Sequence, residues 1–369
     1  MNGNVPMIER NLRRLLGVLA ALHMAFFALF VATLVSATPA AARDASARPD
    51  NCTGRNLAAV IAQRDPVAMA RIRARAAETP NGRGVLWRVE REGAVSHLFG
   101  TAHVTDPRIT ELSPAVETLV SDASIVVLEI AELADPQAMR AAAVPAMPKM
   151  LYMDGTTLDT HLAGADLATL RQRTESPDMP WQVTRIMRPW TVMAALSVPA
   201  CERAAQKRGE PVLDQILAQR AAATGIPVIG LETVVEQADF MANLPEPLMV
   251  QSLLDVLRMG SGIDDMFETT LALYDSGDTA LLWALVREPA LAKVLGLTAT
   301  AEEATRRKEG YAAFQAKLLD ERNRNMAERM QPHLQKGGAF VAVGALHLPG
   351  EEGVVALLRE RGWDVTRVE

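Results

Sequence analysis

Two short stretches of the chain carry the same pattern, an apolar strand that runs into Gly-x-x-His. The first contains Gly100 and His103, and the second contains Gly344 and His347. A glycine at a strand end allows the backbone to turn tightly. The histidine three residues later is then expected on a loop at the sheet edge, where α/β proteins carry their chemistry. Two such loops on one sheet would bring two imidazoles to one place.

Two further predicted strands end in carboxylates. The apolar run Ile125–Leu128 leads into Glu129, and the run 226–231 leads into Glu232. The carboxyl ends of parallel strands share one edge, so we expect the two imidazoles and the two carboxylates to converge there. A carboxylate that ends an apolar run is costly to bury without a partner. Each glutamate could alternatively be an ion-pair partner or begin the next helix.

Two imidazoles with one or two carboxylates form a ligand set for a divalent metal ion such as Mn²⁺, Co²⁺, Zn²⁺ or Fe²⁺. We therefore predict His103, His347 and Glu129 as metal ligands. Such an ion polarises a carbonyl or lowers the pKa of a bound water. Glu232 could act as general base, as could Glu129 where it does not bind the ion. A single histidine at a strand end more often caps or hydrogen-bonds, so the prediction rests on the repeated pattern.

A densely polar segment over Asp320–Met326 lies inside a long predicted helix. Its residues Arg322 and Asn323 lie either on a solvated face with i,i+4 charge pairs or in the pocket. In a pocket, Arg322 could clamp a substrate carboxylate or stabilise an oxyanion, which makes it a candidate catalytic residue. Asp214 is either a pocket residue or an acid in the first turn of a helix.

Strand-helix-strand units at both ends of the body predict an α/β fold with a mostly parallel central sheet. We place this domain at residues 85–369 and a large helical insertion at about 135–330. A helical lead-in occupies 43–84, with one amphipathic helix expected over Leu57–Ala77. The domain begins with a hairpin whose turn is Glu92-Gly93.

The N-terminal 42 residues form a separate segment. Three arginines precede an uncharged apolar run over 15–37, and Ala40-Ala41-Ala42 follows. This order is typical of an export signal cleaved after Ala42. The run is also long enough to span a bilayer, so a retained membrane anchor is the alternative. Either interpretation predicts a body outside the cytoplasm, periplasmic or attached to the membrane.

Composition narrows the class of protein further. The chain is 49% hydrophobic and carries a net charge of −6, which suits a globular protein and argues against a nucleic-acid binder. Its two cysteines, Cys52 and Cys201, lack Cys-x-x-Cys or metal spacing. In an oxidising compartment we expect them to form a disulfide, with two buried thiols as the alternative. The sequence makes no prediction of the oligomeric state.

Taken together, the motifs resemble the TraB/GumN family, which is related to the Tiki proteins. The matching segments are Phe99-Gly100-Thr101-Ala102-His103, Ser113-Pro114, Val127-Leu128-Glu129, Leu213-Asp214, Gly225-Ile226-Pro227-Val228, Leu231-Glu232-Thr233 with Gln237, Asp320-Glu321-Arg322-Asn323 and Val343-Gly344-Ala345-Leu346-His347-Leu348-Pro349-Gly350. The resemblance implies a fold like that of the erythromycin-esterase and ChaN group. It also implies that His103 and His347 are metal ligands or catalytic residues, with Glu129 as a third and Arg322 in the pocket.

Tiki-like members are metal-dependent proteases that act outside the cytoplasm, whereas most bacterial relatives have no assigned reaction. We therefore expect a metal-dependent hydrolase of the cell envelope that cleaves a peptide or amide bond. One alternative is a metal-independent, esterase-like enzyme, and another is a non-enzymatic protein that binds haem, a metal or a peptide. An aromatic residue often follows the Glu-Arg-Asn motif in relatives, where this chain has Met326, so the pocket lining is expected to differ.

Overall fold

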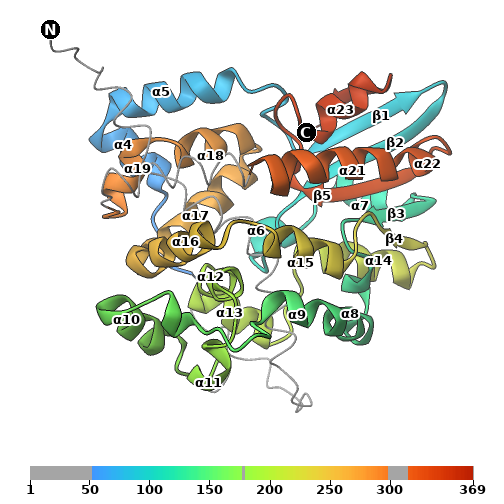
Figure 1. The fold of residues 1–369 in the computed structure, drawn as a ribbon. Helices are drawn as coiled ribbons and strands as arrows, with labels where there is room; N and C mark the ends of the chain where they lie inside the picture. Colours follow the sequence, from blue (N-terminus) through green and yellow to red (C-terminus); the bar gives the residue numbers. More distant parts are fainter. Residues whose placement is uncertain (1–51, 177–178, 298–314, 369) are drawn as a thin grey trace, which may run out of the picture.

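The structure is a computed structural model that describes residues 52–176, 179–297 and 315–368 (Figure 1). The apolar run 15–37 and the predicted cleavage position after Ala42 lie outside these residues. Within the described ranges, no helix has both the length and the apolar character needed to cross a membrane.

The described residues contain a six-stranded sheet in the order β4-β3-β5-β2-β1-β6. Strands β2, β3, β4 and β5 run parallel to one another, and β1 pairs antiparallel with β2 and with β6. The predicted α/β fold with a mostly parallel sheet is therefore confirmed. The strands are β1 (Leu86–Arg91), β2 (Ala94–Thr101), β3 (Ile125–Leu128), β4 (Val228–Gly230), β5 (Ala339–Gly344) and β6 (Asp364–Arg367).

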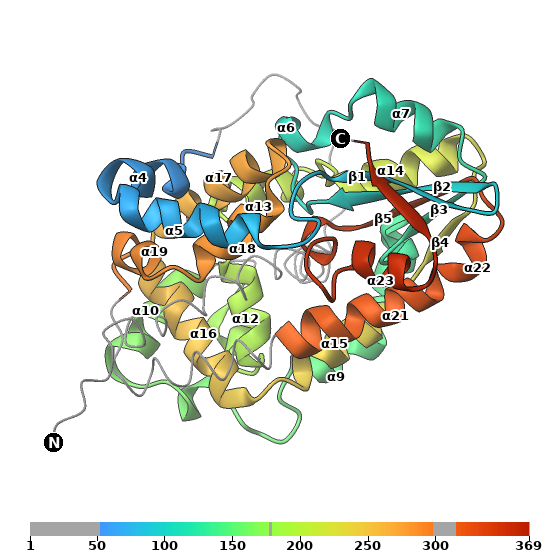
Figure 2. The same ribbon diagram turned by 90° about the horizontal axis from the view of Figure 1, so that it is seen from above.

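Helices cover both faces of the sheet (Figure 2). Helices α7 (Pro114–Ser121) and α14 (Leu213–Ala223) lie on one face, and α21 (Glu321–Arg329), α22 (Gln331–Leu334) and α23 (Val354–Glu360) lie on the other. Along β5, Phe340 packs towards α7 and α14, and the next residue, Val341, packs towards α21 and α23. A parallel strand buried on both faces is apolar at every position, as the sequence of β5 is.

A larger helical region lies beside the sheet (Figure 1) and has its own hydrophobic core. Most of its helices come from residues 57–77 and 136–294, whereas α14, β4 and α21, which also fall within 135–330, belong to the sheet and the helices that cover it. Its helices are α4 (Leu57–Arg64), α5 (Pro66–Ala77), α8 (Pro136–Ala143), α9 (Met147–Met150), α10 (Gly164–Thr174), α11 (Trp181–Thr184), α12 (Pro189–Leu196), α13 (Ala200–Lys207), α15 (Val234–Ala242), α16 (Glu246–Met259), α17 (Gly262–Asp275), α18 (Thr279–Val286) and α19 (Pro289–Val294). The short helix α6 (Pro107–Thr110) instead places Ile109 in the core that the sheet forms with α7 and α14. Short 3₁₀ turns occur at Ala131–Ala134, Val144–Ala146, Leu158–Thr160 and Ala345–His347, and a π-helical turn occurs at Gln315–Asp320.

Local sequence signals account for most element boundaries. The predicted hairpin is present, and Glu92 and Gly93 both have positive φ (53° and 84°), as a type I′ turn requires. The single helix expected over Leu57–Ala77 is wrong, because it breaks at Asp65 and Pro66. Proline has no N–H to donate and disfavours helical geometry at the preceding residue. Asp65 instead caps α5 by accepting the N–H of Ala68 at 2.9 Å.

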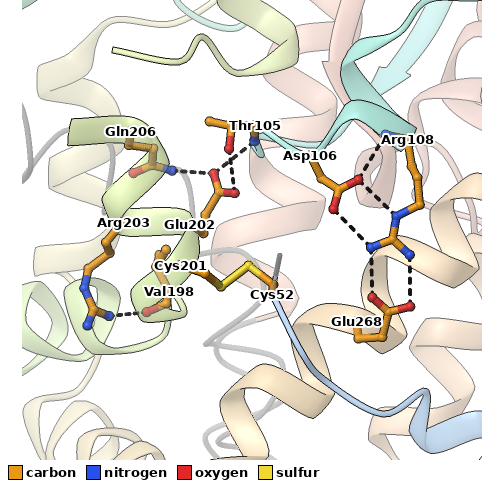
Figure 3. Close-up of a disulfide and its surroundings, with 10 residues drawn as sticks. All are labelled: Cys52, Thr105, Asp106, Arg108, Val198, Cys201, Glu202, Arg203, Gln206 and Glu268. Carbon is orange, nitrogen blue, oxygen red and sulfur yellow. Dashed lines mark hydrogen bonds and ion pairs between the residues drawn. A yellow bond between two sulfur atoms is a disulfide. The ribbon is translucent and has the colours of Figure 1, made fainter. Parts of the chain in front are cut away.

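A disulfide joins Cys52 to Cys201 across 149 residues of sequence (Figure 3). Cys52 lies just before α4, and Cys201 lies in the first turn of α13. The bridge therefore fixes the N-terminal lead-in to a helix of the insertion. Closing so long a loop restricts the unfolded chain, which is the main way a disulfide stabilises a fold.

We predict that reducing the Cys52–Cys201 bridge lowers the free energy of unfolding by about 2–5 kcal/mol, because the unfolded chain regains its freedom. Urea denaturation with and without dithiothreitol measures the difference. The double variant Cys52→Ser/Cys201→Ser is the control and should unfold at the same urea concentration in both buffers. Equal midpoints for the oxidised and reduced wild type would contradict this prediction.

Candidate active site

Four adjacent parallel strands end at the same edge of the sheet. In the order β4-β3-β5-β2, they lead into Glu232, Glu129, His347 and His103. The register aligns the last residues of neighbouring strands, with Leu128 opposite Gly230 and Thr101 opposite Gly344. The four side chains that the sequence places at one edge therefore start from neighbouring backbone positions.

The glycines of the two Gly-x-x-His segments allow close packing. Neither Gly100 nor Gly344 has a positive φ, so the backbone conformation that favours glycine is not what these positions use. A Cβ at Gly100 would lie 2.7 Å from Leu348 Cδ1 and 2.9 Å from Ala345 Cα. The backbone of the first segment thus packs directly against the second, and a side chain would separate them.

Gly344 has the site's side chains around it. A Cβ there would lie 3.2 Å from Glu129 Oε1, 3.4 Å from His347 Cδ2 and 3.9 Å from His103 Nε2. The Gly344 N–H donates to Glu129 Oε1 at 2.7 Å. Three of the predicted site residues therefore meet at a strand end whose lack of a side chain makes room for them.

Arg322 joins the two carboxylates. Its Nη2 donates to Glu129 Oε2 at 2.7 Å and to Glu232 Oε2 at 2.6 Å, and its Nε donates to Glu232 Oε1 at 3.0 Å. Gln237 of α15 donates its Nε2 to Glu129 Oε2 at 3.2 Å and to Glu232 Oε2 at 3.0 Å. All four residues are buried. Two carboxylates therefore share one guanidinium and one amide.

The charges within this cluster determine how its groups ionise. Burial alone would raise the pKa of Glu129, but the charges of Arg322, His347 and His103 hold it well below the ordinary 4.5. Burial would likewise lower the pKa of Arg322, but Glu232 and Glu129 raise it. With both imidazoles neutral, the two carboxylates and the one guanidinium carry a formal net charge of −1 in a buried place.

His103 is held through one ring nitrogen. Its Nδ1 lies 2.6 Å from Asp214 Oδ2, and Thr101 Oγ1 donates to Asp214 Oδ1 at 2.9 Å. An ionised carboxylate only accepts, so Nδ1 carries the proton and Nε2 lies on the side of Gly344. Burial would lower the pKa of His103, but the charge and hydrogen bond of Asp214, together with Glu129, raise it.

His347 is held in the same way by an amide. Its Nδ1 lies 2.6 Å from Asn323 Oδ1, and Asn323 Nδ2 donates to the Glu352 carbonyl at 2.7 Å. This second bond fixes which end of the amide faces the imidazole, so His347 Nδ1 donates and Nε2 carries the lone pair. Nε2 lies 3.3 Å from Arg322 Nη1 and 3.8 Å from Glu129 Oε1.

Imidazole and carboxylate are donor types that bind divalent metal ions, but the described structure does not arrange them as a metal site. Histidines that bind metals usually donate their other ring N–H to an oxygen, as His103 and His347 do. In the described part of the chain, however, no three His, Cys, Asp or Glu side chains are grouped closely enough to hold an ion. Arg322 contacts Glu129 and lies beside His347 Nε2, so a cation at these residues would compete with its guanidinium.

The polar edge opens into a cavity of about 130 Å³. Site residues including His103, Glu129 and His347 line one part of it. Apolar side chains from α15, the end of α16 and α17 line another part, among them Phe240, Met241, Met259, Ile263, Met266 and Phe267. A substrate in this cavity would contact both polar groups and an apolar surface.

Sequence reasoning missed part of the surroundings. Glu202 of α13 lines the cavity and accepts from Thr105 N–H at 3.0 Å, from Thr105 Oγ1 at 2.9 Å and from Gln206 Nε2 at 2.9 Å (Figure 3). Burial raises its pKa. Its only sequence signal is its position next to Cys201. Met326, where relatives often carry an aromatic residue, does not line the cavity, because this fully buried side chain packs between α21 and the sheet.

The fold and the site define an α/β protein whose parallel strands end in two histidines and two glutamates around a buried arginine. The profile of the TraB/PrgY/gumN family matches residues 85–367, and the chain belongs to this family. This range includes every strand and all the site residues described above.

Curated relatives of the chain are named as metalloproteases. The chain is 27% identical over 314 residues to metalloprotease TIKI1 of Danio rerio, covering 76% of this chain and 62% of the relative. It is 28% identical over 312 residues to metalloprotease TIKI2 of Xenopus tropicalis, covering 76% and 59%. The match to human metalloprotease TIKI1 is 26% over 313 residues, covering 76% and 61%. The chain thus spans about three fifths of the length of these relatives. No solved structure matches it.

We predict that Arg322→Met lowers the free energy of unfolding at pH 7 by about 3–5 kcal/mol, because two buried carboxylates lose their cation. The pH dependence should also change sign. In the wild type, the depressed pKa of Glu129 contributes stability above about pH 4.5 that is lost on acidification. In the variant, burial raises that pKa, so stability should increase as the pH falls from 7 towards 5.

Arg324→Met is the matched control. Arg324 lies on the same helix but pairs with Glu352 on the surface, where both side chains are about half exposed. Its loss should change the free energy of unfolding by no more than about 1 kcal/mol. Urea denaturation at several pH values measures both effects. Equal stability of the two variants at pH 7 would show that the buried contacts of Arg322 with Glu129 and Glu232 do not stabilise the fold.

Proposed function

We propose that this chain is a hydrolase of peptide or amide bonds that uses a divalent metal ion held by His103, His347 and Glu129. Family membership and the names of the metalloprotease relatives support the hydrolase class. The observation that carries the metal assignment is the pair of imidazoles, each held through Nδ1, beside a buried cluster with excess negative charge. A cation would balance that charge.

The metal ion, when bound, polarises the scissile carbonyl or lowers the pKa of a water molecule. Asp214 and Asn323 keep the two imidazoles in fixed orientation. Glu129 Oε2 is tied to Arg322 and Gln237, while Oε1 accepts the Gly344 N–H on the side of the histidines. We therefore assign Glu129 Oε1 the role of ligand or proton acceptor.

Glu232 acts differently from Glu129 in this proposal. Both of its oxygens accept from Arg322, and one also accepts from Gln237. We assign Glu232 the positioning of Arg322, and Arg322 the orientation of the substrate beside Glu129. A guanidinium at this place can also stabilise an oxyanion as negative charge develops.

A metal-independent hydrolase is the second candidate, and the His103–Asp214 pair favours it. The 2.6 Å contact and the raised pKa of His103 are typical of an imidazole that accepts a proton during catalysis. Arg322 lies on Glu129, where a metal ligand would otherwise be available. In this reaction His103 is the general base, and no ion is needed.

We also propose that the protein works outside the cytoplasm, in the periplasm or attached to the membrane through residues 15–37. The Cys52–Cys201 disulfide supports an oxidising compartment. The proposed substrate is a peptide or another small amide.

We predict that the purified protein, stripped of metal and dialysed against Mn²⁺, Co²⁺ or Zn²⁺, retains bound ion, and that His103→Ala/His347→Ala loses it. Elemental analysis and peptide cleavage, followed by mass spectrometry, measure the two effects. His97→Ala is the matched control, because His97 lies within β2 opposite Arg88, away from the strand end. It should keep both ion and cleavage.

Unchanged ion content in the double variant would contradict the metal assignment. Cleavage that survives chelation but disappears in the double variant would support the metal-independent candidate. Loss of ion and cleavage together in the double variant is the result that the metal proposal requires.

A further inference from the structure

Gln237 has a side-chain amide oxygen with no hydrogen-bond donor among the described residues. Its Nε2 donates to Glu129 and Glu232, and because carboxylates only accept, the amide cannot be turned round. Its Oε1 is buried and has no hydrogen-bond partner among the described residues. A buried carbonyl oxygen without a donor is unfavourable, and in native proteins it requires an explanation.

The position of Gln237 supplies that explanation. The side chain is only 2% exposed and lines the same cavity as His103, Glu129 and Gly344. Oε1 itself is covered in the described structure, so a molecule in the cavity donates to it once the side chains that cover it shift. Hydrolysis of a peptide brings N–H groups to this place, whereas an ester oxygen in the same position has no proton to donate.

The apolar part of the cavity indicates what lies next to that N–H. Three methionines line it, Met241, Met259 and Met266, together with Ile263 and Phe267. Methionine side chains are flexible and adapt to apolar groups of different shape. The volume of about 130 Å³ is close to that of the cavity of about 150 Å³ that holds a benzene molecule in another protein. It suits one aliphatic side chain of the size of leucine or methionine.

We propose that this cavity selects an amide whose N–H donates to Gln237 Oε1 and whose neighbouring aliphatic side chain fills the methionine-lined wall. The inference rests on the proposed function and names its substrate class. Gln237 is then a specificity-determining residue that favours amides over esters, in addition to holding the two glutamates.

Binding of small probes tests this without requiring turnover. The parent probe is N-acetyl-leucine N-methylamide, and two esters of the same shape each replace one of its two N–H groups with oxygen. Calorimetric titration in the presence of a chelator gives the dissociation constants. The ester that lacks the N–H bound by Gln237 Oε1 should bind the wild type about tenfold more weakly than the parent does, which is the usual effect of one hydrogen bond. The glycine analogue of the parent should also bind at least about tenfold more weakly, because it buries less apolar surface.

Gln237→Met keeps the shape of the side chain and removes the acceptor. In this variant the ratio between parent and ester should fall to about one. A merely structural role for Gln237 would weaken both probes equally and leave the ratio unchanged, which would overturn the inference. Gln206→Met is the matched control, because Gln206 Oε1 is a second cavity-lining amide oxygen without a partner among the described residues. It should keep the wild-type ratio.

The outcomes separate this inference from the proposed function. Equal binding of the parent and both esters to the wild type overturns the inference even if peptides are cleaved, and it does not depend on the folding of any variant. A tenfold ratio in the wild type that falls to about one in Gln237→Met supports the inference even if no cleavage is found, in which case the proposed function fails alone.

Discussion

One buried guanidinium holds the functional edge of this protein together. Arg322 reaches from α21 across the end of the sheet to the carboxylates that follow β3 and β4. Removing three charged groups from water is expensive unless each finds partners, and here Gln237 and the Gly344 N–H complete the set. These contacts join the sheet to α21 and α15, and breaking them would leave buried charges without partners. The same groups lie beside both histidines.

This arrangement fixes both the charge of the site and the orientation of its two imidazoles. Glu129 is ionised because of the positive groups around it, yet the cluster of Glu129, Glu232 and Arg322 keeps one excess negative charge. Both imidazoles have their Nδ1 bound to oxygen, so their Nε2 atoms lie on the inner side of the site. A cation or a developing positive charge would be attracted to such a place. Apolar side chains line much of the cavity next to it, and such low-polarity surroundings strengthen electrostatic interactions.

The parts of this picture that depend on local patterns could be predicted from the sequence. Apolar runs that end in His103, Glu129, Glu232 and His347 were enough to place these residues at one edge, because parallel strands align their carboxyl ends. Ser113-Pro114 and Glu92-Gly93 likewise determine a helix start and a hairpin turn through capping and backbone conformation.

What depends on contacts between distant segments could not be predicted. The sequence left open whether Arg322 lies in solvent or in the pocket, because the decision depends on carboxylates 90 and 193 residues away. Asp214 was equally undecided, since its partner His103 is 111 residues away. Gly100 was expected to permit a turn, but the structure shows another reason for a glycine there. A side chain at this position would collide with Ala345 and Leu348, which come from the other end of the chain. The cavity wall from α15 to α17 has no sequence motif at all.

The most direct test of the account is a crystal structure grown with Mn²⁺ or Co²⁺ and measured at the absorption edge of that metal. We expect one anomalous peak within coordination distance of His103 Nε2, His347 Nε2 and an oxygen of Glu129, with Asp214 and Asn323 still on the Nδ1 atoms. A structure in which Arg322 keeps its place on Glu129 and no metal lies beside either histidine would contradict it.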